Sequence, residues 1–277
     1  MKKSIRRLLI ILVVAPVVVG IVYFDMQPYH TLPFLIFITG AALMGLNEYF
    51  DMAKIGHNEI QFQIGHFLVI LLILLGFFQE LSFFWNSLFA LGLNVILISY
   101  MLLEVFLHRL FFFESNIGKT VRGILYLGWF FTYFILIRNL SMGKSLILFI
   151  LFTIWALDIG AYMFGKLFGR HKLNPEISPK KTIEGSIGGF LTAVAVSVIY
   201  SMNISSLGVV HGLVLGSILG VLGQFGDLYE SLIKRTYHVK DSSNIIPGHG
   251  GVMDRADSFI FIAPMVYYYI IIAGLAG

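Results

Sequence analysis

The chain has 277 residues, of which 58% are hydrophobic and 12% are charged, whereas soluble domains carry about 25% charged residues. This composition excludes an ordinary soluble globular protein and predicts a polytopic membrane protein. The net charge is +4 and no cysteine is present, which excludes disulfides and thiolate metal sites.

About nine apolar stretches approach the length of about 20 residues that crosses a bilayer. They predict an all-α, polytopic integral membrane protein with spans near 7–24, 31–50, 64–80, 83–106, 120–138, 145–166, 185–202, 207–226 and 257–275. The basic start of the first span is typical of a signal peptide. Because no convincing cleavage site follows it, we expect an uncleaved span.

An odd number of spans places the two termini on opposite sides of the membrane. With a cytoplasmic N-terminus, every Lys and Arg falls in an inside segment except Arg138 and Lys144. This distribution follows the positive-inside rule and supports both the count and the orientation. We therefore expect a multi-pass protein of the cytoplasmic membrane, whose positive charge faces anionic lipid at the cytoplasmic side and does not indicate a nucleic-acid partner.

Polar residues are distributed unevenly along the chain. Up to about residue 140 the loops are short and carry no cluster of chemically active side chains. We expect residues 1–140 to form a scaffold that faces lipid or a second subunit, and residues 141–277 to form the catalytic region.

Asp158 lies in the body of the sixth predicted span. A carboxylate in a membrane costs about 2.5–3.5 kcal/mol on insertion scales and normally faces a cavity or a partner. Asp158 is therefore either a functional carboxylate or one half of a structural ion pair with Lys or Arg of a neighbouring helix.

The segment SPKKTIEG enters the seventh span from the cytoplasmic side. It supplies hydrogen-bond donors before its first carboxylate, a composition typical of a phosphate site, and the residues concerned are Ser178, Lys180, Lys181, Thr182 and Glu184. The spacing of a Walker A loop is missing. The alternative is a positive-inside loop that precedes a glycine-rich packing face.

The segment GQFGDLYESLIKR leaves the eighth span on the cytoplasmic side. If the helix continues here, Asp227 shares a face with Glu230 and Ser231, and Lys234 follows two turns later. A carboxylate and an ammonium group would then converge on one side. The alternative is an ordinary amphipathic helix at the membrane surface.

The segment PGHGGVMDRADS begins the last span. Gly250 and Gly251 permit a turn whose N–H groups face an anion, and Asp254 and Asp257 share a helix face. Carboxylates are the ligands that Mg²⁺ prefers, and Mg²⁺ usually takes one or two of them beside water and substrate phosphates. His249 is a candidate donor to phosphate, with metal ligation or a structural role as the alternatives.

The predicted orientation places these last three segments together on the cytoplasmic face, with Asp158 within reach. Carboxylates, cations and flexible backbone are the components of metal-assisted chemistry on phosphates. The cations that would offset phosphate charge are Lys180, Lys181, Lys234, Arg235, Lys240 and Arg255, and arginine suits bidentate phosphate contacts.

The chain resembles the phosphatidate cytidylyltransferases, also called CDP-diacylglycerol synthases, most clearly in their signature. The matching residues are Ser231, Ile233, Lys234, Arg235, Lys240, Asp241, Ser243, Ile246, Pro247, His249, Gly250, Gly251, Val252, Asp254, Arg255 and Asp257. The SPKKT-EG loop, the Gly-Asp pair before the signature and the nine-span hydropathy are also similar to that family. Ala256 replaces a larger apolar residue or threonine, where we expect only a packing change.

The resemblance implies that CTP and phosphatidic acid react to give CDP-diacylglycerol and pyrophosphate, with Mg²⁺, at the cytoplasmic face. It also implies K⁺ as a possible second cation and a homodimer. It implies Asp227 and Asp254 as metal ligands, Asp257 as a supporting metal carboxylate, and Asp241 as a weaker candidate.

Together with the residue chemistry, the resemblance leads to two predicted sets of side chains. The predicted catalytic residues are Asp227, Asp254, Asp257, Lys234 and Arg255. The predicted substrate-binding residues are Ser178, Lys180, Lys181, Thr182, Glu184, Ser231, Arg235, Lys240, Asp241, His249, Gly250 and Gly251.

Three other functions fit parts of the pattern. A CDP-alcohol phosphatidyltransferase is disfavoured because its own signature is absent. An ion-coupled transporter would use Asp158 and Asp227 as coupling carboxylates, but its polar residues should be distributed through the bilayer. A scaffold for anionic lipid would have no need of the carboxylates.

Overall fold

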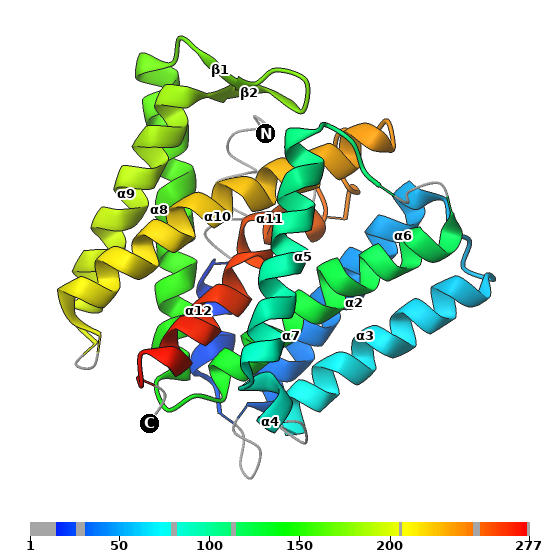
Figure 1. The fold of residues 1–277 in the computed structure, drawn as a ribbon, viewed down its shortest axis with the longest axis horizontal. Coiled ribbons are helices and arrows are strands. Elements are labelled where there is room, and N and C mark those ends of the chain that lie inside the picture. The colour runs from blue at the N-terminus through cyan, green and yellow to red at the C-terminus, as the bar shows by residue number, and fades with distance from the viewer. Residues whose placement is uncertain are drawn as a thin grey trace.

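The computed structural model describes residues 15–25, 31–78, 82–111, 115–204, 207–245 and 250–275. Helices account for almost all of the regular structure, and many of them are long and cross one another at the centre of the molecule (Figure 1). The predicted all-α, polytopic membrane fold is confirmed.

The helices and strands follow one another as α2 (Leu32–Ala53), α3 (Ile60–Phe78), α4 (Ser82–Trp85), α5 (Leu88–Phe106), α6 (Asn116–Gly123), η1 (Ile124–Trp129), α7 (Phe130–Arg138), α8 (Gly143–Phe168), β1 (Lys172–Asn174), β2 (Ser178–Thr182), α9 (Ile183–Ser201), α10 (Gly208–Thr236), α11 (Met253–Ile260) and α12 (Ile262–Ile272). Residues 15–23 are also helical. Within the described residues, eight stretches are long and apolar enough to cross a membrane. The first predicted span, 7–24, lies partly outside them.

The predicted spans agree with these helices except at some ends. The predicted span 83–106 is interrupted between α4 and α5, where Ser87 caps α5 by accepting a hydrogen bond from the Ala90 N–H at 3.2 Å. The predicted span 207–226 is too short as a helix, since α10 continues to Thr236. Its last turns carry the ESLIKR segment, so the predicted continuation of this helix is confirmed.

The core of the molecule surrounds the segment formed by α6, η1 and α7. Every residue of α7 is buried, and α2, α3 and α12 all contact this helix. Aromatic rings pack against α7 from the C-terminal part of the chain: the ring of Phe130 lies 5.7 Å from that of Phe261, and the ring of Tyr133 lies 5.7 Å from that of Tyr267. Such dense apolar packing gives the helices that carry the polar residues a rigid support.

Helices α8, α9 and α10 form a second layer, and small residues allow them to approach closely. A Cβ atom on Gly189 would lie 2.9 Å from the backbone oxygen of Leu157, and one on Gly216 would lie 2.7 Å from the Cβ of Ser197. Small residues at helix contacts are typical of membrane proteins because they bring backbones together.

A short antiparallel hairpin of β1 and β2 joins α8 to α9, and the sequence did not predict it. Lys172 pairs with Thr182 and Asn174 with Ser178. His108, at the end of α5, holds the hairpin through hydrogen-bond distances of 2.7 Å to Glu176 and 3.0 Å to Asn174.

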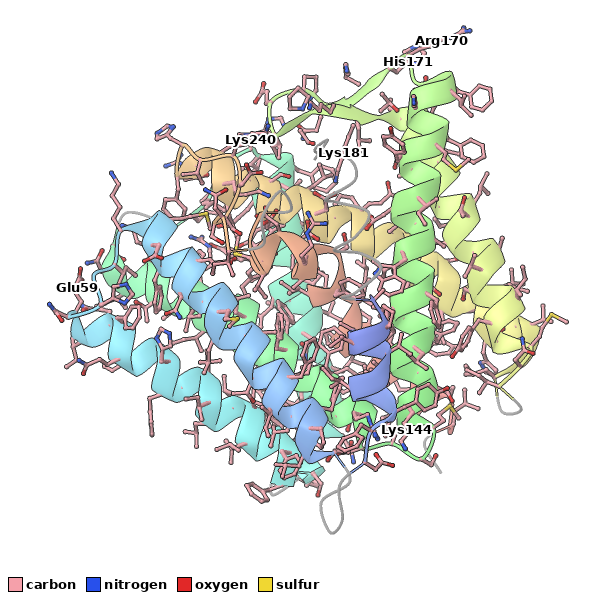
Figure 2. The ribbon with its side chains drawn as sticks, turned by 180° about the vertical axis from the view of Figure 1, so that it is seen from behind. Glu59, Lys144, Arg170, His171, Lys181 and Lys240 are labelled. Carbon is pink, nitrogen blue, oxygen red and sulfur yellow. The ribbon has the colours of Figure 1, made fainter. Side chains whose placement is uncertain are left out.

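The hairpin lies at one end of the helices (Figure 1). Figure 2 shows Arg170, His171, Lys181 and Lys240 at that end and Lys144 at the opposite end. The end that carries the hairpin is therefore the one that the charge distribution predicts to face the cytoplasm.

Candidate functional site

A cavity of roughly 410 Å³ lies between α8, β2, α9 and α10, below the hairpin. Its charged lining residues are Asp158, Lys166, Lys180, Lys181 and Asp227. The cavity therefore joins charged side chains from three of the polar segments that the sequence singles out, and Ser258 of the fourth also lines it. Its remaining walls include glycines of α8, α9 and α10, which allow the polar side chains to face the same space.

An ion pair connects two of these segments inside the cavity. The Nζ of Lys181 on β2 lies 2.5 Å from Oδ2 of Asp227 on α10. Both side chains are half-buried, at 26% and 31% exposure. The other oxygen of Asp227 has a long contact of 3.5 Å with the Ser231 hydroxyl, so Asp227 keeps acceptor capacity toward the cavity.

Three carboxylates concentrate negative charge beside this ion pair. Asp158, Asp227 and Asp257 act electrostatically on one another, and the charge of Lys181 opposes theirs. Asp158 forms no ion pair with any Lys or Arg of the described residues. Such a group of like charges at a cavity is an arrangement that binds a cation or a cationic part of a complex.

The packing of α10 against α11 brings Asp257 to this group. A Cβ atom on Gly226 would collide with the backbone oxygen of Asp257, so only glycine allows this approach. Asp257 itself accepts a hydrogen bond from the Ser258 N–H at 2.6 Å.

Asp254 has different surroundings from Asp257, although the two residues are only one helical turn apart in sequence. Its Oδ1 accepts a hydrogen bond from Lys234 Nζ at 2.6 Å. Its Oδ2 accepts from the N–H groups of Ser242 at 2.9 Å and Gly251 at 2.8 Å, and the Ser242 hydroxyl lies 2.8 Å from the same oxygen. Both oxygens of Asp254 are thus occupied by donors of the chain itself.

Lys234 completes a second, more buried charge group. It forms ion pairs with Asp254 and with the fully buried carboxylate of Glu230, one turn earlier on α10. The sequence predicted that Asp227 and Lys234 converge on one side. Instead, Lys181 is the cation paired with Asp227, while Lys234 pairs with Glu230 and Asp254.

Two residues of the SPKKTIEG segment also make local structural contacts. Thr182 caps α9 by accepting a hydrogen bond from the Gly185 N–H at 3.1 Å. Glu184 closes the base of the hairpin, where it accepts hydrogen bonds from the Arg170 N–H at 3.0 Å and contacts Nδ1 of His171 at 2.6 Å. Lys180 and Lys181 are the two members with charged ends at the cavity.

The remaining predicted residues lie around the cavity and the turn before α11. Arg235 donates to the backbone oxygens of Ile177 at 3.3 Å and Val239 at 3.0 Å, and so connects α10 to the hairpin. Ser178 begins β2. Lys240, Asp241 and Arg255 are exposed. Gly250 has a φ of 82°, a left-handed conformation that favours glycine. His249 lies outside the described residues.

The sequence analysis missed Glu48, a carboxylate near the end of α2. It is 1% exposed and accepts hydrogen bonds from Ser242, Ser243, Val252 and Met253. The signal that could have found it is the one used for Asp158, because a carboxylate inside a predicted span is costly and needs partners.

The carboxylate oxygens around the cavity could bind a hard cation only together with ligands from outside the chain. In the part of the chain that the structure describes, no three His, Asp or Glu side chains are grouped closely enough to hold a metal ion by themselves. A divalent cation here would need water or substrate oxygens in addition to one or two carboxylates.

Comparison with known proteins gives consistent results along the chain. The model of the cytidylyltransferase family matches residues 5–273. A Bacillus subtilis (strain 168) protein named phosphatidate cytidylyltransferase is 37% identical over 260 residues, which are 91% of this chain and 94% of that protein. Proteins of the same name from Staphylococcus haemolyticus and Staphylococcus aureus (strain COL) are 41% and 40% identical over 182 and 179 residues, which are 64% of this chain and 66% of each relative.

Proposed function

Because the chain belongs to the cytidylyltransferase family, we propose that it transfers the cytidylyl group of CTP to phosphatidic acid, with Mg²⁺, at the cytoplasmic face. Membership of the family makes the chain a nucleotidyltransferase, and the names of its relatives supply the lipid substrate. The observation that best supports the proposal is the cavity in which Lys181 of β2 faces Asp227 of α10.

The reaction forms one bond and breaks one bond at the same phosphorus atom. A phosphate oxygen of phosphatidic acid attacks the α-phosphorus of CTP, and the bond from that phosphorus to the oxygen bridging to the β-phosphorus breaks. Pyrophosphate leaves with the electron pair, and CDP-diacylglycerol remains in the membrane. The lipid phosphate is already anionic at neutral pH, so no side chain has to act as a strong base.

The chain's contribution is then to bind, position and offset charge, which accounts for most of the catalysis in phosphoryl transfer. Lys180 and Lys181 project from β2 at the cavity and would bind the phosphates of CTP. A triphosphate would compete with Asp227 for the ammonium of Lys181, because both are anionic partners of the same cation. Binding of CTP would thereby release Asp227 for another cation.

The carboxylates at the cavity fit Mg²⁺ in chemistry. Asp227 keeps acceptor capacity beyond its pair with Lys181, and Asp257 approaches from α11, so these two residues would hold the ion. Asp254 remains a predicted ligand, although it would have to give up hydrogen bonds from Lys234, Ser242 or Gly251 to bind metal. When bound, Mg²⁺ would neutralise charge that develops on the phosphates. K⁺ as a second cation and a homodimer remain predictions.

The lipid substrate fits the location of the cavity. Asp158 lies ten residues before the end of α8, which is about 15 Å along a helix, so the cavity extends into the membrane-spanning part. Tyr162 lines the cavity and is 68% exposed, which brings one wall to the lipid-facing surface of α8. A phospholipid could place its phosphate in the cavity while its acyl chains stay in the bilayer.

The proposal is tested with purified protein, CTP labelled in the cytosine ring, phosphatidic acid and Mg²⁺. We expect label to enter the lipid extract, and we expect chelation by EDTA to abolish this transfer. Diacylglycerol in place of phosphatidic acid should give no labelled lipid because it lacks the attacking phosphate. Uptake of CTP into sealed vesicles without any labelled lipid would instead favour a transporter.

A further inference from the structure

Glu48 is a buried carboxylate in the region of the chain that the sequence predicts to be a scaffold. It lies near the end of α2, and its nearest partners in sequence are 194 residues away. A buried charge is costly unless hydrogen bonds replace its lost hydration. The groups that donate hydrogen bonds to Glu48 therefore indicate which part of the fold its carboxylate stabilises.

Each oxygen of Glu48 accepts one hydrogen bond from a hydroxyl group and one from the backbone. Oε1 accepts from the Ser243 hydroxyl at 2.7 Å and the Val252 N–H at 2.8 Å. Oε2 accepts from the Ser242 hydroxyl at 2.8 Å and the Met253 N–H at 2.9 Å. One side chain thus connects residues 242–243 with residues 252–253, and we call the described residues 242–245 and 250–253 the signature turn.

The backbone donors among these partners belong to the start of α11. The first N–H groups of a helix have no acceptor within the helix, and a negative charge near them is favourable. Glu48 supplies both the acceptors and the charge from a different helix. It therefore fixes where α11 begins and how its first turn is directed.

Glu48 also acts on Asp254 through shared partners. The Ser242 hydroxyl lies 2.8 Å from both carboxylates, and its single proton can serve only one of them at a time. A Cβ atom on Gly251 would collide with the carboxylate of Glu48 and with the Ser242 hydroxyl. Gly251 is thus required by the fit of the turn around Glu48, independently of any phosphate.

We propose that Glu48 is a positioning residue for cytidylyl transfer, because it holds the signature turn and the first turn of α11 in the geometry that presents Asp254, Arg255 and Asp257. Its consequence for turnover rests on the proposed function, whereas its consequence for the turn does not. The neighbouring Tyr49 supports this role, since its hydroxyl lies 3.4 Å from that of Tyr237 at the end of α10. Helix α2 thus braces both α10 and the turn that follows it.

The test replaces Glu48 by Gln, which keeps the shape but presents an amide NH₂ where one backbone N–H and one hydroxyl need an acceptor. We expect kcat to fall about 10- to 100-fold, as misplaced catalytic groups do, with a smaller change in KM for CTP. Glu48→Asp, which keeps the charge on a shorter side chain, should recover part of the loss.

A spectroscopic measurement separates positioning from general destabilisation. The chain has no cysteine, so Ile245→Cys, at an exposed position of the signature turn, can carry a single nitroxide spin label. We expect the label at 245 to become more mobile in Glu48→Gln, while a label at the distant, exposed Asn203 keeps its spectrum. Glu104→Gln is the matched control, because Glu104 is also fully buried but bonds to Arg122 and Tyr229 instead of the turn.

The control should lower thermal stability without mobilising the label at 245. Unchanged kcat and an unchanged label spectrum in Glu48→Gln would overturn the proposal. If Glu48→Gln does not insert into membranes, Ser243→Ala is used instead, because it removes one donor to Glu48 and keeps the charge. We expect a several-fold loss of kcat and a smaller gain in the mobility of the label. No change in kcat and no change in mobility would also overturn the proposal. If the parent protein transfers no cytidylyl group, the proposed function fails, and the label alone decides the role of Glu48 in the turn.

Discussion

Asp227 and Asp254 belong to the same predicted metal set, but their environments assign them different tasks. Asp227 is half-exposed at a cavity and has one close cationic partner, Lys181. The side chain of Asp254 is 7% exposed and engages Lys234, Ser242 and Gly251. Asp227 can exchange partners when substrate binds, whereas Asp254 holds the turn before α11 together.

This difference leads to a prediction for the two asparagine variants. Asp227→Asn should lower turnover by about 10²-fold or more, as expected for a lost charge at a metal–phosphate site, with little change in thermal stability. Asp254→Asn should lower turnover and also destabilise the protein by about 1–3 kcal/mol, because buried donors lose their acceptor.

The measurements are turnover of labelled CTP and the thermal midpoint in the same detergent. Asp51→Asn, at an exposed position near the end of α2, is the control for the loss of a carboxylate. Equal stability of the two variants would contradict the distinction between Asp227 and Asp254.

Several site residues could be predicted from the sequence because their chemistry is costly in a membrane. Asp158, Lys181 and Asp227 stand out as charges at or near apolar spans, and the structure brings all three to one cavity. The partners of Asp254 and Glu48 could not be predicted. They depend on contacts between α2, the signature turn and α11, and a single sequence contains no local signal for contacts over such separations.

At the scale of elements, the contact between α10 and α11 determines how Asp227 and Asp257 meet. Gly226 lies directly against the backbone of Asp257. Any side chain at position 226 would push α11 away from α10 and would separate these carboxylates. The glycine before Asp227 is therefore a packing requirement of the site.

Gly226→Ala should accordingly lower both stability and turnover. Overpacking of this kind costs about 1–3 kcal/mol, and the shift of α11 should reduce kcat more than KM for CTP. The matched control is Gly92→Ala on α5, where a Cβ atom would have no neighbour within 4 Å and alanine favours the helix. Thermal melting and turnover would be compared, and full activity of Gly226→Ala would show that this contact does not position the site.

The spans were predictable as elements because a long apolar run has few alternatives in a bilayer. The hairpin of β1 and β2 was not, since SPKKT lacks the alternation of apolar and polar residues that indicates a strand. Its conformation depends on tertiary contacts, such as those of His108 with Glu176 and Asn174. Helix α10 is longer than its predicted span because its last turns carry polar residues, which a search for apolar runs does not include. These turns lie next to the hairpin, where Arg235 donates to the backbone oxygen of Ile177.

At the scale of the whole molecule, the two predicted regions are not independent. Glu48 of the N-terminal region contacts the signature turn, and Glu104 of α5 bonds to Tyr229 of α10 at 2.9 Å. Residues of the predicted scaffold region therefore contact the helices and the turn that carry the site. The predicted division at residue 140 describes where chemistry concentrates in the sequence, but the site needs both regions to keep its shape.

The predicted orientation can be tested because the chain contains no cysteine. Single cysteines would be introduced at the exposed positions Glu176 in the hairpin and Asn203 beyond the end of α9. In intact cells, a membrane-impermeant thiol reagent should label Asn203→Cys and leave Glu176→Cys unlabelled until the cells are opened. The opposite pattern would place the cavity on the outer face, away from CTP.

The central claim, cytidylyl transfer to the lipid phosphate, is tested most directly by the fate of the phosphorus atoms of CTP. Purified protein would be given phosphatidic acid and Mg²⁺ with CTP labelled at either the α- or the γ-phosphorus. The account predicts that the α-label enters the lipid extract and that the γ-label appears in pyrophosphate in equal amount. Appearance of the γ-label in lipid, or of neither label, would contradict it.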